Sequence, residues 1–94
     1  MMDIRYRHAS SIVAREIAGE VILVPIRQNV GDLESIYTLN ETAASVWELL
    51  DGRRSVGDVC EAIVVEFEVD PEEAGRDVEE LLAQLEEISV IERA

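Results

Sequence analysis

The sequence has no lysine, one cysteine and one histidine, and these scarcities exclude several classes of site. A single thiol, Cys60, cannot build an internal disulfide framework or a multi-cysteine metal site. It lies on an apolar helical stripe, so we expect it to be buried and inert. His8 stands near the N-terminus with no second imidazole or cysteine close in sequence, and we expect it to have no catalytic role. The sequence therefore predicts a protein that is not an enzyme and that holds no metal and no cofactor.

Long apolar runs are absent as well. No run approaches the ~20 consecutive apolar residues of a membrane-spanning helix, and the run at 21–26 has only the length of a strand. The first eight residues, MMDIRYRH, lack the apolar region of a secretory signal. We therefore expect a cytoplasmic protein without a membrane partner. A chain of 94 residues predicts one domain spanning 1–94 with one core, in which 1–10 form a flexible arm.

Positive charge is scarce in the second half of the chain. Residues 1–40 hold five acidic residues and four arginines, whereas residues 41–94 hold sixteen acidic residues and four arginines. The net charges are therefore −1 and −12. Such a field repels phosphate backbones and favours basic or neutral partners, and it also keeps the protein soluble.

The N-terminal part predicts a three-stranded antiparallel sheet. The segments 11–17 and 20–27 are apolar and β-branched, and Ala18-Gly19 between them suits a tight hairpin turn. A polar turn then leads into a third strand at 34–39, where Tyr37 and Leu39 share one face by the period of two. We expect that face to lie on the core.

The C-terminal part predicts three helices, each with an N-cap. The residues that mark the starts are Asn40 for the first helix, Ser55 with Asp58 for the second, and Asp70 with Pro71 for the third. The expected core stripes are Ala43, Val46, Trp47 and Leu50, then Val56, Val59, Cys60, Ile63 and Phe67, then Ala74, Val78, Leu81, Leu85 and Ile88. Trp47, the only tryptophan, is assigned to the core, with a partner-interface anchor as the alternative. The fold class predicted is α+β, winged-helix-like, with a three-stranded antiparallel sheet followed by three helices.

Three stretches in this order carry a resemblance to a known family. They are LNETA at 39–43, WELLDGRRSV at 47–56, and the set Asp77-Val78, Leu81, Leu82 and Leu85. Together they resemble the PqqD-like family of small peptide-recognition domains that serve enzymes modifying ribosomally made peptides. Members devoted to the quinone cofactor PQQ usually close with a glycine and a tryptophan, where this chain has Ile88-Ser89-Val90-Ile91. We therefore favour the broad family over PQQ biosynthesis itself.

The resemblance implies a function and a site. PqqD-like domains hold the leader of a precursor peptide against their third strand and third helix, and present it to a modifying enzyme, commonly a radical-SAM enzyme. An edge strand with unpaired backbone groups can accept a peptide as an added strand. The residues we expect to bind the peptide are Ser35, Ile36, Tyr37, Thr38 and Leu39 on the strand, with Gly75, Arg76, Glu79, Leu82 and Ala83 on the helix. Gly75 would permit close approach of another backbone, or is merely tolerated in the helix.

Two other functions remain open at this point. The strand edge can pair with a second copy, which would make the chain a homodimerising interaction module. A winged-helix fold also suggests an acidic regulator that binds DNA. However, residues 70–88 carry eight acidic residues against one arginine, and DNA affinity comes mostly from cations placed on phosphates. We therefore expect no nucleic-acid partner. The glutamate pairs 72–73, 79–80 and 86–87 are interpreted as a solvated helix face, because a hard-cation site needs converging ligands.

Overall fold

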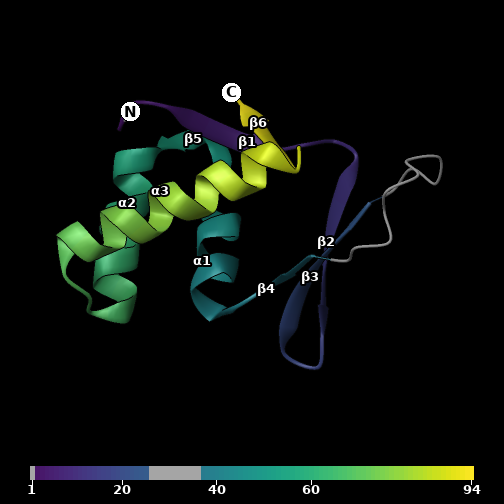
Figure 1. Cartoon of the computed structure of the whole chain (residues 1–94), viewed down its shortest axis with the longest axis horizontal. Helices are drawn as coiled ribbons and strands as arrows, with labels where there is room; N and C mark the ends of the chain where they lie inside the picture. The colour runs from purple at the N-terminus through teal and green to yellow at the C-terminus, as the bar shows by residue number, and fades with distance from the viewer. Residues whose placement is uncertain (1, 26–36) are drawn as a thin grey trace.

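The computed structural model describes residues 2–25 and 37–94, which form a small α+β domain with two three-stranded antiparallel sheets and three helices (Figure 1). In chain order the elements are β1 (Arg5–His8), β2 (Ile12–Ile17), β3 (Glu20–Pro25), β4 (Tyr37–Leu39), α1 (Glu41–Leu49), β5 (Asp51–Ser55), α2 (Val56–Phe67), α3 (Pro71–Glu87) and β6 (Ile91–Arg93). Nowhere in these residues is there a helix both long and apolar enough to cross a membrane.

The predicted N-terminal sheet is confirmed in the residues described. Its strand order is β2-β3-β4, with Ala14 opposite Leu23 and Leu23 opposite Tyr37. The hairpin turns at Ala18 and Gly19, whose φ angles of 53° and 83° are the pair of positive values that a type I′ turn requires. Of the predicted third strand, residues 34–36 lie outside the described part, and β4 accounts for the rest.

The second sheet was not predicted, and it corrects the expectation of a flexible arm at 1–10. β1 is its middle strand, paired with β5 on one side and with β6 on the other. Tyr6 is only 3% exposed and packs into the core, and its hydroxyl donates to Glu86 at 3.3 Å. β5 starts where Asp51 accepts hydrogen bonds from the backbone N–H groups of Arg53 and Arg54. The arm is therefore held by burial and by backbone pairing to segments far away in the sequence.

All three predicted helix starts are confirmed. Asn40 accepts a hydrogen bond from the N–H of Ala43 at 2.8 Å, and Asp70 accepts from two N–H groups in the first turn of α3. Ser55 and Asp58 form a reciprocal capping box at the start of α2. These caps satisfy backbone donors that have no partner inside the helix, so each helix begins at a defined residue.

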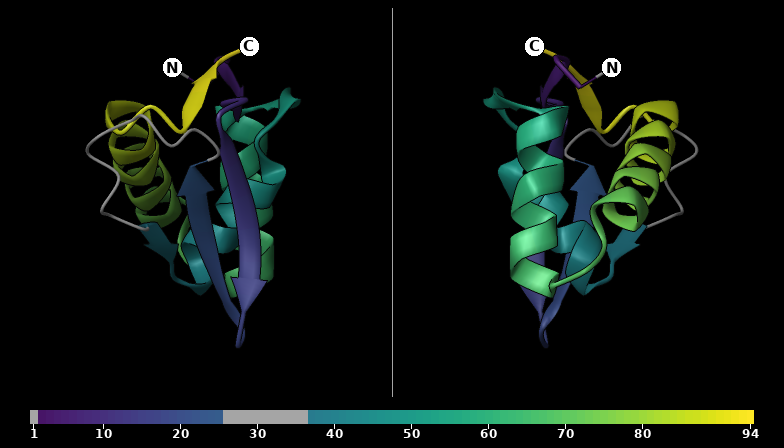
Figure 2. Two further views of the ribbon diagram at one scale, coloured as in Figure 1. Left: turned by 90° about the vertical axis from the view of Figure 1, so that its right-hand side faces the viewer. Right: turned by 90° about the vertical axis from the view of Figure 1, so that its left-hand side faces the viewer.

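The helices enclose one core together with the two sheets (Figure 2). The predicted stripes of α1 and α2 are buried, apart from Phe67, which is half-buried. In α3 the stripe differs from the prediction: Leu82 is 2% exposed, Leu81 is half-buried and Ile88 is 43% exposed. The buried set Ala74, Val78, Leu82 and Leu85 has the spacing of four, four and three, which follows one side of a straight helix. α3 is therefore rotated about its axis relative to the prediction.

Candidate functional site

β4 lies at the edge of its sheet on the side nearest α3 (Figure 2). Within the described residues only β3 pairs with it, so its outer edge offers unpaired backbone N–H and C=O groups. Tyr37 reaches from the start of β4 across to α3, where its hydroxyl donates to Oε1 of Gln84 at 3.1 Å. This hydrogen bond links the start of β4 to α3.

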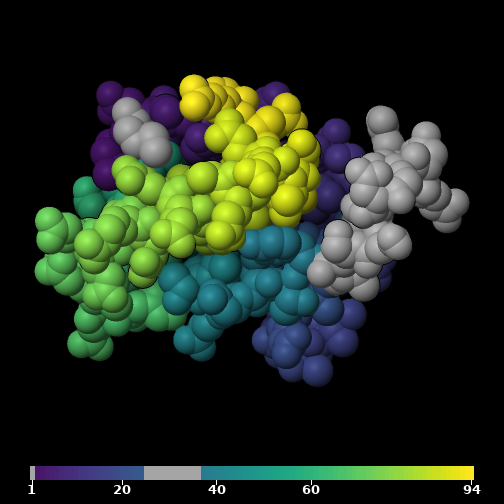
Figure 3. All heavy atoms as spheres, viewed as in Figure 1, coloured from purple at the N-terminus to yellow at the C-terminus, as the bar shows by residue number. Residues whose placement is uncertain are grey.

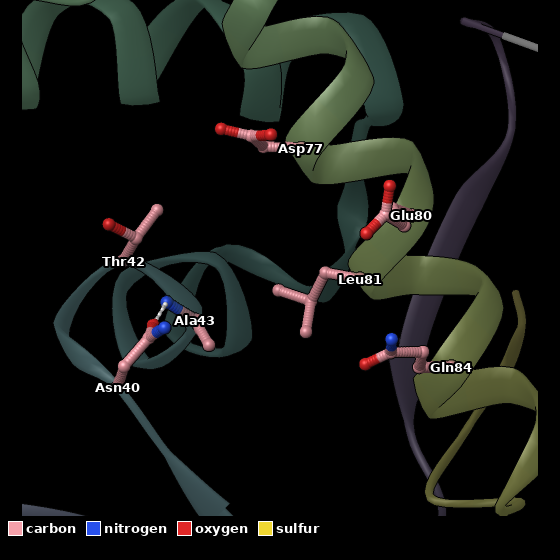
Figure 4. A pocket seen from close by; sticks show the side chains of 7 residues that line it. All are labelled: Asn40, Thr42, Ala43, Asp77, Glu80, Leu81 and Gln84. Carbon is pink, nitrogen blue, oxygen red and sulfur yellow. Dashed lines mark hydrogen bonds between the residues drawn. The ribbon is translucent and has the colours of Figure 1, made fainter.

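A surface hollow of about 270 Å³ lies between the start of α1 and α3, and Gln84 takes part both in its lining and in the bond to Tyr37. α1 and α3 lie side by side at the surface in the space-filling view (Figure 3). The residues that line the hollow are Asn40, Thr42 and Ala43 from the start of α1 and Asp77, Glu80, Leu81 and Gln84 from α3. The side chains from α3 extend toward the first turn of α1 (Figure 4). We call this space the α1–α3 hollow.

The polar groups of the α1–α3 hollow are mostly acceptors. Oδ1 of Asn40 accepts from the N–H of Ala43, and Oε1 of Gln84 accepts from Tyr37, so these two oxygens already have partners. The carboxylates of Asp77 and Glu80 are exposed. Among the described residues the ion pairs join Arg7 to Glu92, Arg54 to Asp51 and Arg93 to Glu86, and none of them involves either carboxylate. The hollow is therefore negatively charged.

The residues expected on the strand are placed as follows. Leu39 is 3% exposed and belongs to the core, Tyr37 is half-buried, and Thr38 is exposed on the opposite face of β4. The expectation that Tyr37 and Leu39 face the core is therefore confirmed. Ser35 and Ile36 lie outside the described residues. A peptide that pairs with β4 would contact the backbone of β4, so the side-chain directions of Tyr37, Thr38 and Leu39 do not prevent strand addition.

The residues expected on α3 do not line the α1–α3 hollow. Leu82 is in the core, which corrects the expectation that it lies toward the groove. Glu79 is half-buried and is absent from the lining of the hollow. Gly75 is half-buried, with nothing within 4 Å of the place where a Cβ would lie, while Arg76 and Ala83 are exposed.

The α3 residues that line the α1–α3 hollow, Asp77, Glu80, Leu81 and Gln84, recur in the sequence at spacings of three and four. Asp77 and Leu81 even belong to the set that carried the resemblance. What the spacing did not reveal was which flank of the helix faces β4. That choice depends on how α3 is rotated against the core, and the rotation is fixed by contacts distant in sequence.

The other candidate residues have structural roles. The His8 ring stacks on Trp47 with centroids 3.7 Å apart, and its Nε2 donates to the Trp47 carbonyl oxygen at 2.7 Å. Trp47 is 3% exposed, which confirms its place in the core. Cys60 is buried as predicted, and burial, assisted by the negative charge of Glu79, raises the pKa of its thiol. In the described ranges no three acidic, histidine or cysteine side chains are placed to hold a metal ion.

The chain is similar to proteins that recognise peptides. A family model described as "Coenzyme PQQ synthesis protein D (PqqD)" matches residues 20–91. A protein of Gluconobacter oxydans (strain 621H), described as a PqqA binding protein, is 34% identical over 58 residues, which are 62% of this chain. The match spans 60% of that protein's length.

Two solved structures have the same fold. The structure titled "Lasso peptide synthetase B1 complexed with the leader peptide" has a TM-score of 0.78 and 25% identity, and the match covers 94% of this chain and 98% of that one. The structure titled "TbiB1 in Complex with the TbiA(beta) Leader Peptide" has a TM-score of 0.76 and 22% identity, with coverages of 92% and 94%.

Proposed function

Because this chain belongs to the PqqD family, we propose that it binds the leader segment of a ribosomally made precursor peptide and presents that peptide to a modifying enzyme. Its own role is binding, without catalysis. The observation that carries the proposal is the outer edge of β4, which has no partner strand among the described residues and lies beside α3, next to the α1–α3 hollow. The titles of the related proteins, which name PqqA or a leader peptide as the bound molecule, support it.

The binding mechanism is strand addition. An extended leader pairs its backbone with the outer edge of β4, so that the sheet β2-β3-β4 gains a fourth strand. Main-chain hydrogen bonds provide affinity that depends little on sequence. Alternate side chains of the added strand then point toward α3, where the α1–α3 hollow provides specificity. Residues 35 and 36 would extend the pairing beyond β4, as the sequence predicts.

We further propose that the modifying enzyme is of the radical-SAM class and that the complex forms in the cytoplasm. The acidic surface of α3 suits such an encounter, since a basic patch on the enzyme would be attracted to it. Precursor peptide and enzyme would then meet on the same domain. Genes for a short peptide and for a radical-SAM enzyme beside this gene would support both proposed partners, the precursor peptide and the enzyme.

Two alternatives use the same fold differently. A homodimer would pair the β4 edges of two copies around a two-fold axis, and light scattering would then give twice the mass of one chain without any peptide. An acidic winged-helix regulator would place α3 on DNA. The eight carboxylates within residues 70–88 oppose that, because they repel phosphates.

Titration of a synthetic leader peptide into ¹⁵N-labelled protein tests the proposal. The leader is taken from a short precursor-peptide gene found beside this one. We expect binding without any cofactor, with amide shifts concentrated in 37–39 and along 77–84, since these residues contact the added strand. A scrambled peptide should cause clearly smaller shifts at the same concentration, and a DNA duplex at moderate salt should cause none. Shifts confined to β2 and to the hairpin turn would contradict the site.

A further inference from the structure

The α1–α3 hollow has a charge that the proposed function does not explain. Strand addition needs only the edge of β4, and a pocket for an apolar leader side chain would need no carboxylates. Yet Asp77 and Glu80 border the hollow together with Leu81, and all three lie on the part of α3 beside the start of α1 (Figure 4). A peptide seated on β4 would bring its side chains against these groups.

The chemistry of the hollow selects one kind of side chain. Leu81 offers an apolar surface, and the wall opposite is formed by the half-buried Thr42 and the buried Ala43 of α1. The acceptor oxygens of Asn40 and Gln84 are already bonded, which leaves the two carboxylates as the strong acceptors. Long basic side chains lay an aliphatic stem on apolar surface and keep the charged head at a polar rim. In the hollow, Leu81 is the apolar surface for the stem, and the carboxylates of Asp77 and Glu80 are the polar groups for the charged head.

The start of α1 makes the electrostatic potential of the hollow less negative, because a helix N-terminus carries about half a positive charge. Two full negative charges from Asp77 and Glu80 outweigh it, and Glu41 in the first turn of α1 partly neutralises it as well. Arg76 precedes Asp77 on the helix but forms no ion pair with Asp77 or Glu80. In the described part of the chain the hollow is thus left with a net negative charge that a ligand can neutralise.

We propose that the leader peptide places a lysine or arginine in the α1–α3 hollow, with its stem on Leu81 and its cation between the carboxylates of Asp77 and Glu80. This inference rests on the proposed function, because it assumes that a peptide lies along β4. It names the class of leader that this chain accepts: an extended segment with a basic residue at the position that faces the end of β4. Leaders with an acidic residue there are rejected by repulsion.

The first experiment identifies the preference without knowing the natural ligand. A random library of 15-residue displayed peptides is selected against the full chain and against the Asp77→Asn, Glu80→Gln double variant. Both positions are exposed and take no part in a hydrogen bond or ion pair among the described residues, so the fold should be retained. We expect the full chain to enrich lysine or arginine at one fixed position of the selected peptides. The double variant should select peptides without that enrichment.

The second experiment measures the effect. One selected peptide is synthesised with lysine at the enriched position and again with norleucine, which keeps the stem and removes the charge. We expect the lysine peptide to bind the full chain about fivefold or more tightly than the norleucine peptide, the result of two partly exposed ion pairs. The double variant should bind the two peptides within about twofold of each other.

A matched control separates the hollow from the general charge of the protein. Glu61→Gln with Glu87→Gln also removes two negative charges, from exposed positions outside the hollow. It should preserve the lysine preference. Equal loss of the preference in this control, or peptide binding to the full chain with no basic enrichment, would overturn the inference and leave the proposed function intact. Failure of every peptide to bind at β4 would overturn the proposed function, and the inference with it.

Discussion

Leu82→Glu should unfold the protein, whereas Leu81→Glu should leave it folded and unable to bind its peptide. Leu82 is 2% exposed and has no polar partner, so a carboxylate there would lose its hydration without compensation. The expected cost is several kcal/mol, on the order of the whole stability of a domain of this size. Thermal denaturation followed by circular dichroism should show no cooperative transition for Leu82→Glu.

Leu81 is one position away but half-buried, at the border of the α1–α3 hollow. A glutamate there can turn its carboxylate to water, so the melting temperature should change by only a few degrees. Leader affinity should fall by about tenfold or more, or about 1.4 kcal/mol, because the apolar floor of the hollow is lost. Leu82→Met, which conserves volume, serves as the folding control. If Leu81→Glu unfolds the protein and Leu82→Glu does not, α3 has the rotation that the sequence predicted.

Deleting residues 1–8 should abolish the cooperative unfolding transition. β1 is the middle strand of its sheet, so its removal leaves β5 and β6 without any partner and opens the core where Tyr6 was. The point variant Tyr6→Ala tests the same strand without deleting it. We expect the free energy of unfolding to fall by about 3–5 kcal/mol, as for other truncations of large aromatic side chains. Urea denaturation measures both.

Arg7→Ala is the control for that experiment. Arg7 is on the same strand, but its side chain is exposed and forms one loose ion pair with Glu92 at 3.6 Å. Its replacement should cost less than about 1 kcal/mol. A truncated chain that melts like the full one would show that residues 1–8 are the flexible arm expected from the sequence.

The sequence predicted the features that depend on residues close to one another in the chain, namely the helix caps and the hairpin turn. The caps at Asn40, Ser55 and Asp70 and the turn at Ala18-Gly19 are each fixed by residues within a few positions, and all were predicted correctly. The burial of Trp47 was also predicted, from helical periodicity alone.

The missed features depend on partners far away in sequence. β1 and β5 are short and mostly polar, and β1 acquires its strand conformation by pairing with residues 51–55 and 91–93. In the same way, stripes with the spacing of α3 fit more than one rotation of the helix, and packing against the rest of the core decides between Leu81 and Leu82. The strand and the helix named from the sequence are the two elements beside the α1–α3 hollow, but the α3 residues that line it are on another flank than those named, and Leu82 lies in the core.

The pairing of β1 with β6 also determines when this protein can complete its fold. Tyr6 lies opposite Arg93 and His8 opposite Ile91, so the first strand to be synthesised must wait for one of the last segments of these 94 residues. A ribosome adds about 5–20 residues per second, and contacts between segments so distant in sequence form late and slow the folding rate. During translation the hairpin β2-β3 can form early, but Tyr6 has its full set of neighbours only after Ile91–Arg93 have left the exit tunnel. Until then the apolar surface that Tyr6 covers in the finished fold stays exposed on the nascent chain.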